Sequence, residues 1–174
     1  MTVSPKPPRE KIAPSLRAIR LGDAEALCAM VNMPGFRHGT LRMPFERVDQ
    51  WEKRIARAGT ESTWIVAEIE GQLVGHGNLT SQSAIRRAHI GEIVLGVDDN
   101  FVGRRIGLAL LEALLDVADN WRALKRVELT VYADNEPAVG LYTRCGFVAE
   151  GRQVKAGFRD GAYHDLLFMA RLRF

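Results

Sequence analysis

One stretch of the chain combines a carboxylate with a basic, glycine-flanked loop. Residues 89–115 are HIGEIVLGVDDNFVGRRIGLALLEALL, in which Glu92 interrupts an apolar run and the loop Val102–Gly107 carries two arginines. A loop that leads directly into a helix presents free backbone N–H groups and the positive end of the helix dipole to one point. Because arginine side chains join them here, the stretch predicts a pyrophosphate site with a base beside it.

A strand and a helix must flank this loop to form such a site. The apolar run Ile90–Val97 predicts the strand, and the apolar stripe after the loop predicts a helix that packs against a sheet. Elsewhere, apolar patterning and turn residues predict strands at 15–20, 63–69, 73–80, 127–132, 147–155 and 164–172, helices at 24–31, 46–58 and 136–145, and a loop at 32–45.

This order of elements favours a mixed α/β or α+β sheet with helices on its faces. The Rossmann spacing GxGxxG and the Walker pattern GxxxxGK[ST] are both absent from the sequence, so a doubly wound nucleotide fold is not expected. Gly75 and Gly77 interrupt the strand at 73–80, which indicates either a bulge or the close approach of a ligand.

Composition indicates an ordinary globular protein with a mild basic bias. We expect a loose arm over residues 1–13 and one domain over 14–174, since 174 residues with 47% hydrophobic content are enough for one core. A net charge of +3 is too small to argue for nucleic acid. The separated Cys28 and Cys145 are typical of reduced thiols in the cytoplasm, and neither a metal-ligand spacing, a signal peptide nor a membrane span is recognisable.

A second motif, LTVYADNEPAVGLYTRCGF at residues 129–147, follows the strand–VGRRIG–helix unit. Together the two resemble the cofactor motifs of the GNAT superfamily of acyl-CoA N-acyltransferases, over about residues 15–174. In the first motif, [QR]xxGx[GA], Val102 stands in the Gln/Arg position and Arg105 in the first Gly position, while Gly103, Ile106 and Gly107 match. The second motif is complete in Asn135, Ala138, Leu141, Tyr142, Gly146 and Phe147.

Two further stretches, GTLRMPFERVDQWEKRIA and DGAYHDLLFMARL, resemble the bacterial YhhY-type branch, which is associated with N-acetylation of free amino acids. The resemblance implies a mixed, mostly antiparallel sheet with a splayed middle strand and helices on both faces. It also implies acetyl-CoA as cosubstrate, without a metal. Its pantetheine is expected to pair with the main chain at the end of the splayed strand. The implied cofactor contacts are Leu95, Gly96, Val97, Val102, Gly103, Arg104, Arg105, Ile106, Gly107, Asn135, Ala138 and Tyr142.

A helical backbone at Arg105, as expected at a helix start, would tolerate this side chain in the glycine position. Glu92 is the candidate base, directly or through a water, and is expected to be partly buried beside Ile90 and Val94; alternatively it points inward and pairs with an arginine such as Arg86 or Arg87. Tyr142 is the candidate acid, because the family's Leu–Tyr tyrosine lies near the thioester sulfur; alternatively its ring packs in the core.

Several other polar residues are expected to be structural. Glu128, Thr130 and Tyr132 alternate with apolar residues and are expected to face solvent, and His76 and His89 are expected to be satisfied polar residues.

The resemblance implies an N-acetyltransferase that moves an acetyl group to a primary amine of a small acceptor, first of all a free amino acid. Direct attack by the amine needs no enzyme nucleophile, so Cys145 is expected to be a bystander. The stretch 34–45 is expected to hold the acceptor, with Phe36, Leu41 and Met43 as an apolar wall.

Acetylation of a protein N-terminus and a non-catalytic CoA-binding sensor remain as alternatives to this function. We expect no nucleic-acid or membrane partner, and a homodimer is consistent with the family.

Overall fold

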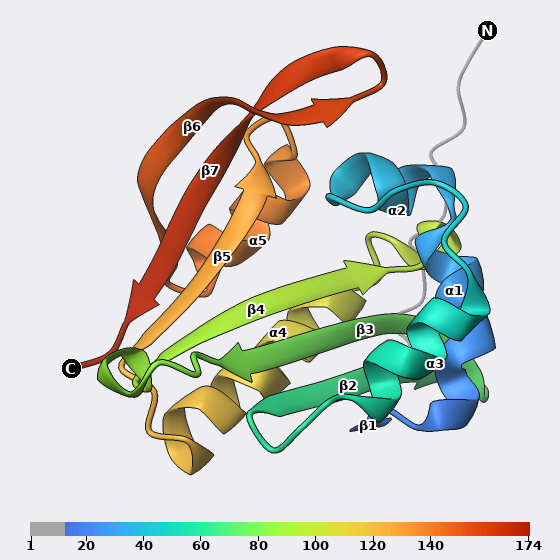
Figure 1. Cartoon of the computed structure of the whole chain (residues 1–174), viewed down its shortest axis with the longest axis horizontal. Coiled ribbons are helices and arrows are strands. Elements are labelled where there is room, and N and C mark those ends of the chain that lie inside the picture. Colours follow the sequence, from blue (N-terminus) through green and yellow to red (C-terminus); the bar gives the residue numbers. More distant parts are fainter. Residues whose placement is uncertain (1–12) are drawn as a thin grey trace, which may run out of the picture.

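The computed structural model describes residues 13–174, so the arm expected over residues 1–13 lies outside the described residues except for its last one. Seven strands form one sheet in the order β1-β2-β3-β4-β5-β7-β6, and every neighbouring pair is antiparallel except β4 and β5 (Figure 1). The strands are β1 (Ser15–Ala18), β2 (Ser62–Ile69), β3 (Gln72–Ser81), β4 (Ile90–Val97), β5 (Arg126–Tyr132), β6 (Val148–Arg159) and β7 (Ala162–Leu172).

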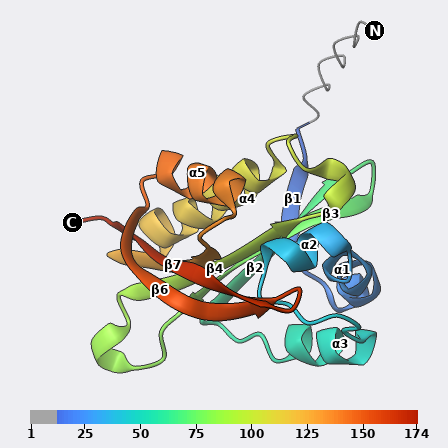
Figure 2. The same cartoon turned by 90° about the horizontal axis from the view of Figure 1, so that it is seen from above.

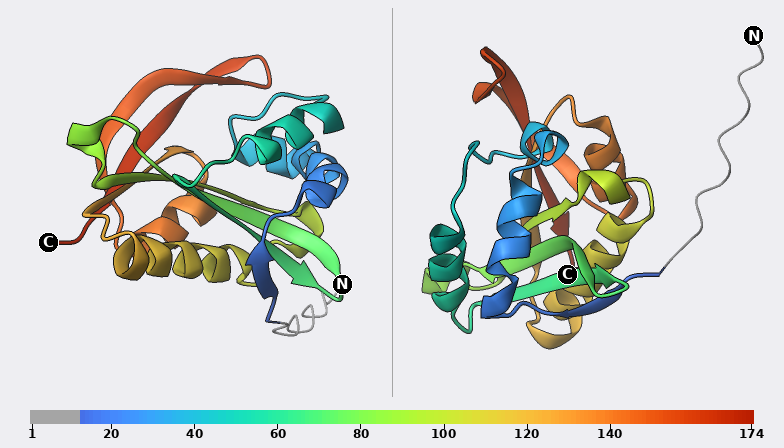
Figure 3. Two further views of the ribbon diagram at one scale, coloured as in Figure 1. Left: turned by 60° about the horizontal axis from the view of Figure 1, so that its bottom comes forward. Right: turned by 90° about the vertical axis from the view of Figure 1, so that its right-hand side faces the viewer.

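Helices cover both faces of the sheet (Figures 2 and 3). One face carries α4 (Ile106–Asp116) and α5 (Glu136–Arg144), and the other carries α1 (Ala24–Val31), α2 (Pro34–Gly39) and α3 (Val48–Ala56). The apolar stripe of α4 packs on β2, β3 and β4, as expected for a helix that is apolar over most of its surface. The mixed, mostly antiparallel fold with helices on both faces is therefore confirmed.

Two expectations about the elements are wrong. The stretch 32–45 is not all loop, because α2 forms within it; Pro34 occupies the first helical position, where its missing N–H costs nothing and its fixed φ suits the helix. The last two strands form a longer hairpin than expected. Register shifts in β6, between Ala149 and Gly151 and between Gln153 and Gly157, break the alternation that would have revealed its full length.

The central feature of the sheet is the divergence of β4 from β5. β4 pairs with β3 from Gly91 to Val97, but its parallel pairing with β5 is confined to Ile90–Glu92. Beyond that point β5 follows β7 as far as Tyr132, and in Figure 1 the two strands separate from a common start. Within the described residues, the edge of β4 that faces β5 therefore has no ladder partner after Glu92.

The glycines of β3 allow α4 to approach the sheet closely. A β-carbon on Gly77 would lie 2.9 Å from Cδ1 of Leu114, and one on Gly75 would lie 3.1 Å from both Ile106 and Leu110 side chains. The register of β2 and β3 shifts beside Gly75, so a bulge is present as well. Of the two alternatives for these glycines, the bulge is correct, and the close approach is made by a helix rather than a ligand.

We expect Gly77→Ala to lower the free energy of unfolding by about 1–3 kcal/mol, because the added methyl group overpacks the interface with α4. The measurement is a urea titration. Gly140→Ala is the matched control: no atom lies within 4 Å of the β-carbon position on this helical glycine, so stability should stay equal or rise by about 0.5–1 kcal/mol. Equal loss of stability in both variants would contradict this account of β3.

Candidate active site

The junction between β4 and α4 presents backbone amides at the start of a helix. After β4 the chain makes a short 3₁₀ turn, η3 (Asp99–Phe101), in which the buried Asp98 carboxylate accepts a hydrogen bond from the Asn100 amide at 2.8 Å. The amide of Ala109 donates to the Arg105 carbonyl at 3.0 Å. The amides of Ile106–Leu108 thus lie in the first turn, where a helix offers no carbonyl partners of its own. These donors and the helix dipole meet at the loop, as the sequence predicted.

The expected helical backbone at Arg105 is wrong. This residue has φ 64° and ψ 13°, the left-handed conformation, and Gly103 has φ 78°. A side chain in this conformation costs about 1–2 kcal/mol, which explains the glycine of the family motif at this position. Arg104 lies against Phe101, with its guanidinium 4.8 Å from the ring centre, and Arg105 is exposed. Both charges therefore remain at the loop despite the departure from the motif.

Substitutions in this loop test whether its backbone holds the coenzyme. Arg105→Gly keeps the left-handed backbone without strain, so we expect the Kd for CoA to stay within about threefold. Gly103→Val places a β-branched side chain at positive φ and should raise the Kd at least tenfold, about 1.4 kcal/mol. Isothermal titration with CoA measures both. If Gly103→Val binds CoA as the unmodified chain does, the loop does not form the cradle.

The two sequence motifs converge beside this loop. A β-carbon on Gly107 would lie 3.3 Å from Leu141 of α5, 3.7 Å from Val97 and 3.9 Å from Leu95 of β4. Gly96 faces the opposite side of β4, where a β-carbon would lie 2.2 Å from the Phe36 ring. The structure therefore brings Leu95, Val97 and Gly107 together with the second motif, whereas Gly96 packs against α2.

α2 connects the separated ends of β4 and β5. The Gly35 amide donates to the Asp99 carboxylate at 2.7 Å, just after β4. At the other end of α2, the Gly39 carbonyl accepts a hydrogen bond from the Asn135 side-chain amide at 3.3 Å, just after β5. Asn135 is also the N-cap of α5, because its side-chain oxygen accepts from the Ala138 amide. The predicted cofactor residues Asn135 and Ala138 therefore lie at the mouth of the splay.

Tyr142 lies in the core beneath the splay. Its side chain is 7% exposed and its ring meets Phe147 edge-on at 5.8 Å. Burial raises the pKa of its hydroxyl to about 12. The ring thus packs in the core, and its hydroxyl is protonated at neutral pH, which is the state that a general acid needs.

Glu92 is exposed, so the expected partial burial is wrong. Alternate residues of β4 face opposite sides of the sheet: Ile93 joins the core under α4, whereas Glu92 faces away from it with its register partner Thr80. In the described part of the chain no ion pair joins Glu92 to Arg86 or Arg87. Arg87 instead lies 3.5 Å from Glu128. The carboxylate therefore remains available on the face opposite the α4 core.

The expectation that Glu128 and Tyr132 face solvent is also wrong, although Thr130 between them is exposed. Glu128 is buried and accepts a hydrogen bond from Arg126, and Tyr132 is buried with the Arg159 guanidinium 4.3 Å from its ring centre. The alternating pattern of β5 predicted a half-exposed strand. That pattern does not reveal that Arg87 and Arg159, from other elements, lie against Glu128 and Tyr132.

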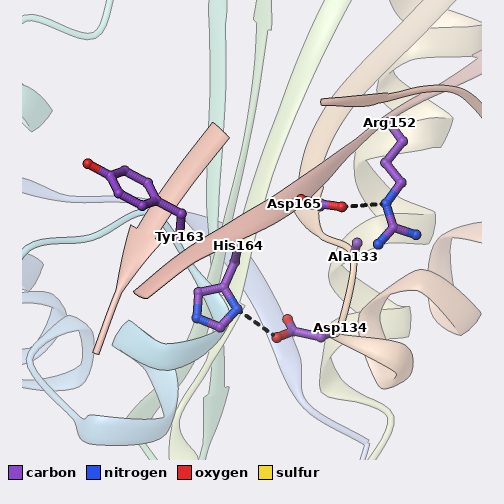
Figure 4. Close-up of a pocket in the computed structure, with 6 residues that line it drawn as sticks. All are labelled: Ala133, Asp134, Arg152, Tyr163, His164 and Asp165. Atoms are coloured by element: carbon purple, nitrogen blue, oxygen red, sulfur yellow. Dashed lines mark hydrogen bonds and ion pairs between the residues drawn. The ribbon is translucent and has the colours of Figure 1, made fainter. Parts of the chain in front are cut away.

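Two cavities open near the separated strands. One, of about 320 Å³, lies at the end of β5 and is lined by Ala133, Asp134, Arg152, Tyr163, His164 and Asp165 (Figure 4). The other, of about 440 Å³, lies beside Glu92, because the strand neighbours Thr80 and Val94 line it. Its other lining residues are Arg42, Trp51, Arg54, Arg57, Ala58, Glu61, Ser62, Trp64, His76 and Asn78.

The stretch 34–45 contributes to the larger cavity in a different way from that expected. Phe36 is buried and stacks on His76 with ring centres 6.0 Å apart, whereas Leu41 and Met43 are 59% and 71% exposed and do not line the cavity. The residue between them, Arg42, does line it. Of this segment only Arg42 lines the cavity, and the expected place of the acceptor stays a prediction.

No described helix is long and apolar enough to cross a membrane. No group of three or more His, Cys, Asp or Glu side chains among residues 13–174 is arranged to hold a metal ion.

The sequence is similar to those of known acetyltransferases. The model of the acetyltransferase (GNAT) family matches residues 30–147. The L-amino acid N-acetyltransferase AaaT of Escherichia coli (strain K12) is 34% identical over 159 residues, which cover 91% of this chain and 97% of that protein. The spermidine N(1)-acetyltransferase of Vibrio cholerae is 26% identical over 155 residues, or 87% of this chain and 88% of that protein.

A solved structure extends the similarity to three dimensions. The crystal structure of spermidine N-acetyltransferase from Vibrio cholerae in complex with CoA and spermine superimposes with a TM-score of 0.82 at 26% identity, over 91% of this chain and 95% of that one.

Proposed function

The chain belongs to the GNAT family of acetyltransferases and is an acetyl-CoA-dependent N-acetyltransferase, and from this premise we propose that its acceptor is the α-amino group of a free L-amino acid. The observation that carries the coenzyme's place in this proposal is the separation of β4 from β5 beside the first turn of α4. The separation leaves main-chain groups for a ligand to pair with, and the helix start offers amides to a diphosphate. The similarity to the amino-acid enzyme over nearly the whole chain supports the acceptor class.

The residues at this separation fit CoA. In our proposal the loop residues Val102, Gly103, Arg104, Arg105, Ile106 and Gly107 hold the pyrophosphate. The main chain of Leu95, Gly96 and Val97 pairs with the pantetheine, as a peptide adds to a sheet edge. Asn135, Ala138 and Tyr142 border it from α5. Acetyl-CoA supplies an electrophilic acetyl carbon on a thiol leaving group.

Three groups of the chain assist the transfer. Glu92 takes a proton from the acceptor ammonium, directly or through a water, because only the neutral amine has a lone pair with which to attack. A backbone N–H of β4 within Leu95–Val97 donates to the acetyl oxygen as negative charge develops on it. Tyr142 donates its hydroxyl proton to the departing sulfur and regains a proton as the nitrogen loses its second one on forming the amide.

An acyl-cysteine route is not part of this proposal. Cys145 lies at the end of α5, and burial raises the pKa of its thiol, so that it is protonated and a weak nucleophile at neutral pH. Direct attack by the amine then needs no enzyme nucleophile, and the reaction requires both substrates to be bound together.

The experiment measures the rate at which the CoA thiol is released from acetyl-CoA, using a thiol reagent for detection. Single L-amino acids, polyamines and short peptides are tested as acceptors. We expect turnover with one or more free L-amino acids. Turnover with peptides alone would indicate an N-terminal acetyltransferase. If CoA raises the Tm but no amine gives turnover, the chain is a CoA-binding sensor.

We also propose that residues 14–174 act as one catalytic domain in the cytoplasm, and that it forms a homodimer without nucleic acid. The free Cys28 and Cys145 support a reducing compartment. The edge strand β6 exposes Val148, Val154 and Phe158, which supports self-association through this edge. Light scattering coupled to gel filtration measures the mass in solution.

A further inference from the structure

The larger cavity beside Glu92 is bordered on one side by alternate residues of β3. His76, Asn78 and Thr80 share one face of this strand and all line the cavity. Thr80 is the register partner of Glu92, and Asn78 is the partner of Val94. Moving along β3 from Asn78 to Thr80 therefore leads to the candidate base.

His76 presents an unpaired donor. The Trp64 indole N–H donates to Nδ1 of His76 at 3.2 Å, so Nδ1 carries no proton. Burial lowers the pKa of His76 to about 3, helped by the charge of Arg42, so the ring is neutral and its proton is on Nε2. The side chain is only 2% exposed, and Nε2 has no hydrogen-bond partner among the described residues. The expectation that this histidine is fully satisfied is therefore wrong.

Asn78 presents donors as well. The Ser62 hydroxyl donates to its side-chain oxygen at 2.7 Å, which occupies the amide's acceptor. The NH₂ group of Asn78 is left to donate. Asn78 is half-buried, so a ligand that brings an acceptor to this wall can pair with its NH₂ group.

Arg42 supplies the charge. Its guanidinium lies 4.8 Å from the ring centre of Trp51, and its side chain is 26% exposed. The Glu46 oxygen paired with it is 3.8 Å away, beyond hydrogen-bond distance, because the other oxygen of Glu46 accepts from Arg54 at 2.9 Å. Burial lowers the pKa of Arg42, and Arg54 lowers it further, although Glu46 opposes both. An anion in this cavity would relieve that unfavourable environment.

We propose that this cavity binds the carboxylate of the amino-acid acceptor, with Arg42 as its cation and Asn78 as a neutral donor, against the buried ring of His76. The inference rests on the proposed function and names the part of the acceptor that the enzyme selects. A strand rises about 3.3 Å per residue, so Asn78 and Thr80 are about 7 Å apart. A small amino acid with its carboxylate at the level of Asn78 therefore places its amine between that level and the level of Glu92.

The other cavity is less suited to this role. Its ionic groups are paired with each other: Arg152 lies 2.6 Å from Asp165, and His164 lies 3.3 Å from Asp134 (Figure 4). In the cavity beside Glu92, Arg54 is paired with Glu46 at 2.9 Å, whereas Arg42 has no carboxylate within hydrogen-bond distance among the described residues. The incompletely paired Arg42 favours an anion there.

The test compares one L-amino acid that the enzyme accepts with its carboxamide, which keeps the amine and side chain but lacks the carboxylate. We expect kcat/KM to favour the acid at least 50-fold. Arg42→Gln should reduce this preference to less than fivefold, mainly by raising KM for the acid. Arg42→Lys, which keeps the charge but loses the planar fork, should be intermediate. The control is Arg47→Gln, which removes an exposed arginine that is paired with Asp49.

A binding measurement separates this inference from the proposed function. In a Trp121→Phe background, which removes the exposed indole, the fluorescence of Trp51 and Trp64 reports on the cavity directly. We expect L-amino acids to change it in the presence of CoA, with a Kd at least tenfold weaker in Arg42→Gln.

A fluorescence response without turnover would reject the proposed function but keep the carboxylate site. No response, or equal effects of Arg42→Gln on the acid and the amide, would overturn the site. CoA titration of each variant verifies that it is folded.

Discussion

Tyr142→Phe is expected to lower kcat about 10²- to 10³-fold while the Kd for CoA stays unchanged, as for the loss of a general acid. The phenylalanine keeps the ring that packs against Phe147 in the core, so the fold should be preserved. Single-turnover kinetics with saturating acetyl-CoA measures the effect on the transfer step. Tyr163→Phe is the matched control, because this tyrosine is 67% exposed on β7 and lies outside the proposed machinery.

The pH dependence of stability supplies an independent check on this tyrosine. Burial raises the pKa of Tyr142 in the folded chain to about 12, whereas an unfolded tyrosine ionises near 10. The stability linked to this difference is complete below pH 10 and is lost as the pH rises towards 12. Tyr142→Phe lacks that loss, so its stability relative to the unmodified chain should improve over this interval. If kcat is unaffected, Tyr142 has only the packing role.

Glu92→Gln is expected to lower kcat/KM for the acceptor about 10²-fold at neutral pH, because the amide does not take the proton from the acceptor ammonium. The exposed position of Glu92 on β4 makes the change mild for the fold. Above the pKa of the acceptor amine the need for a base declines, so the deficit should shrink as the pH rises. A pH–rate profile of both proteins measures this.

Glu112→Gln is the control for Glu92→Gln, since Glu112 is exposed on α4, against the opposite face of the sheet. A deficit that stays constant across the pH range would indicate that Glu92 only shapes the site.

The sequence predicted those parts of the protein that local patterns specify. The strand Ile90–Val97, the helix that follows it and the cap Asn135 all occur as expected, because apolar periodicity and capping residues act within a few positions of each other. The left-handed backbone at Arg105 was missed, since an arginine favours the helical expectation there and only the glycine of the family motif hinted otherwise.

The acceptor side was less predictable, because its walls come from distant segments. The role proposed for Arg42 depends on Trp51 beneath it and on His76 of another element, and neither neighbour is visible in the local pattern around residue 42. Glu128 likewise lies between Arg126 of its own strand and Arg87 of a distant segment. Periodicity describes one strand at a time and does not reveal which side chains from elsewhere complete a site.

The short helix α2 has a consequence for how acceptor preference evolves. It is tied to Asp99 at the coenzyme end and to Asn135 at the start of α5, and its Phe36 ring rests on Gly96. A substitution that tilts this helix to admit a bulkier amine also changes the gap between the two diverging strands. Under the proposed function, selection for new acceptors through α2 is therefore expected to be coupled to coenzyme affinity, whereas replacements at Arg42 are expected to alter acceptor choice independently of it.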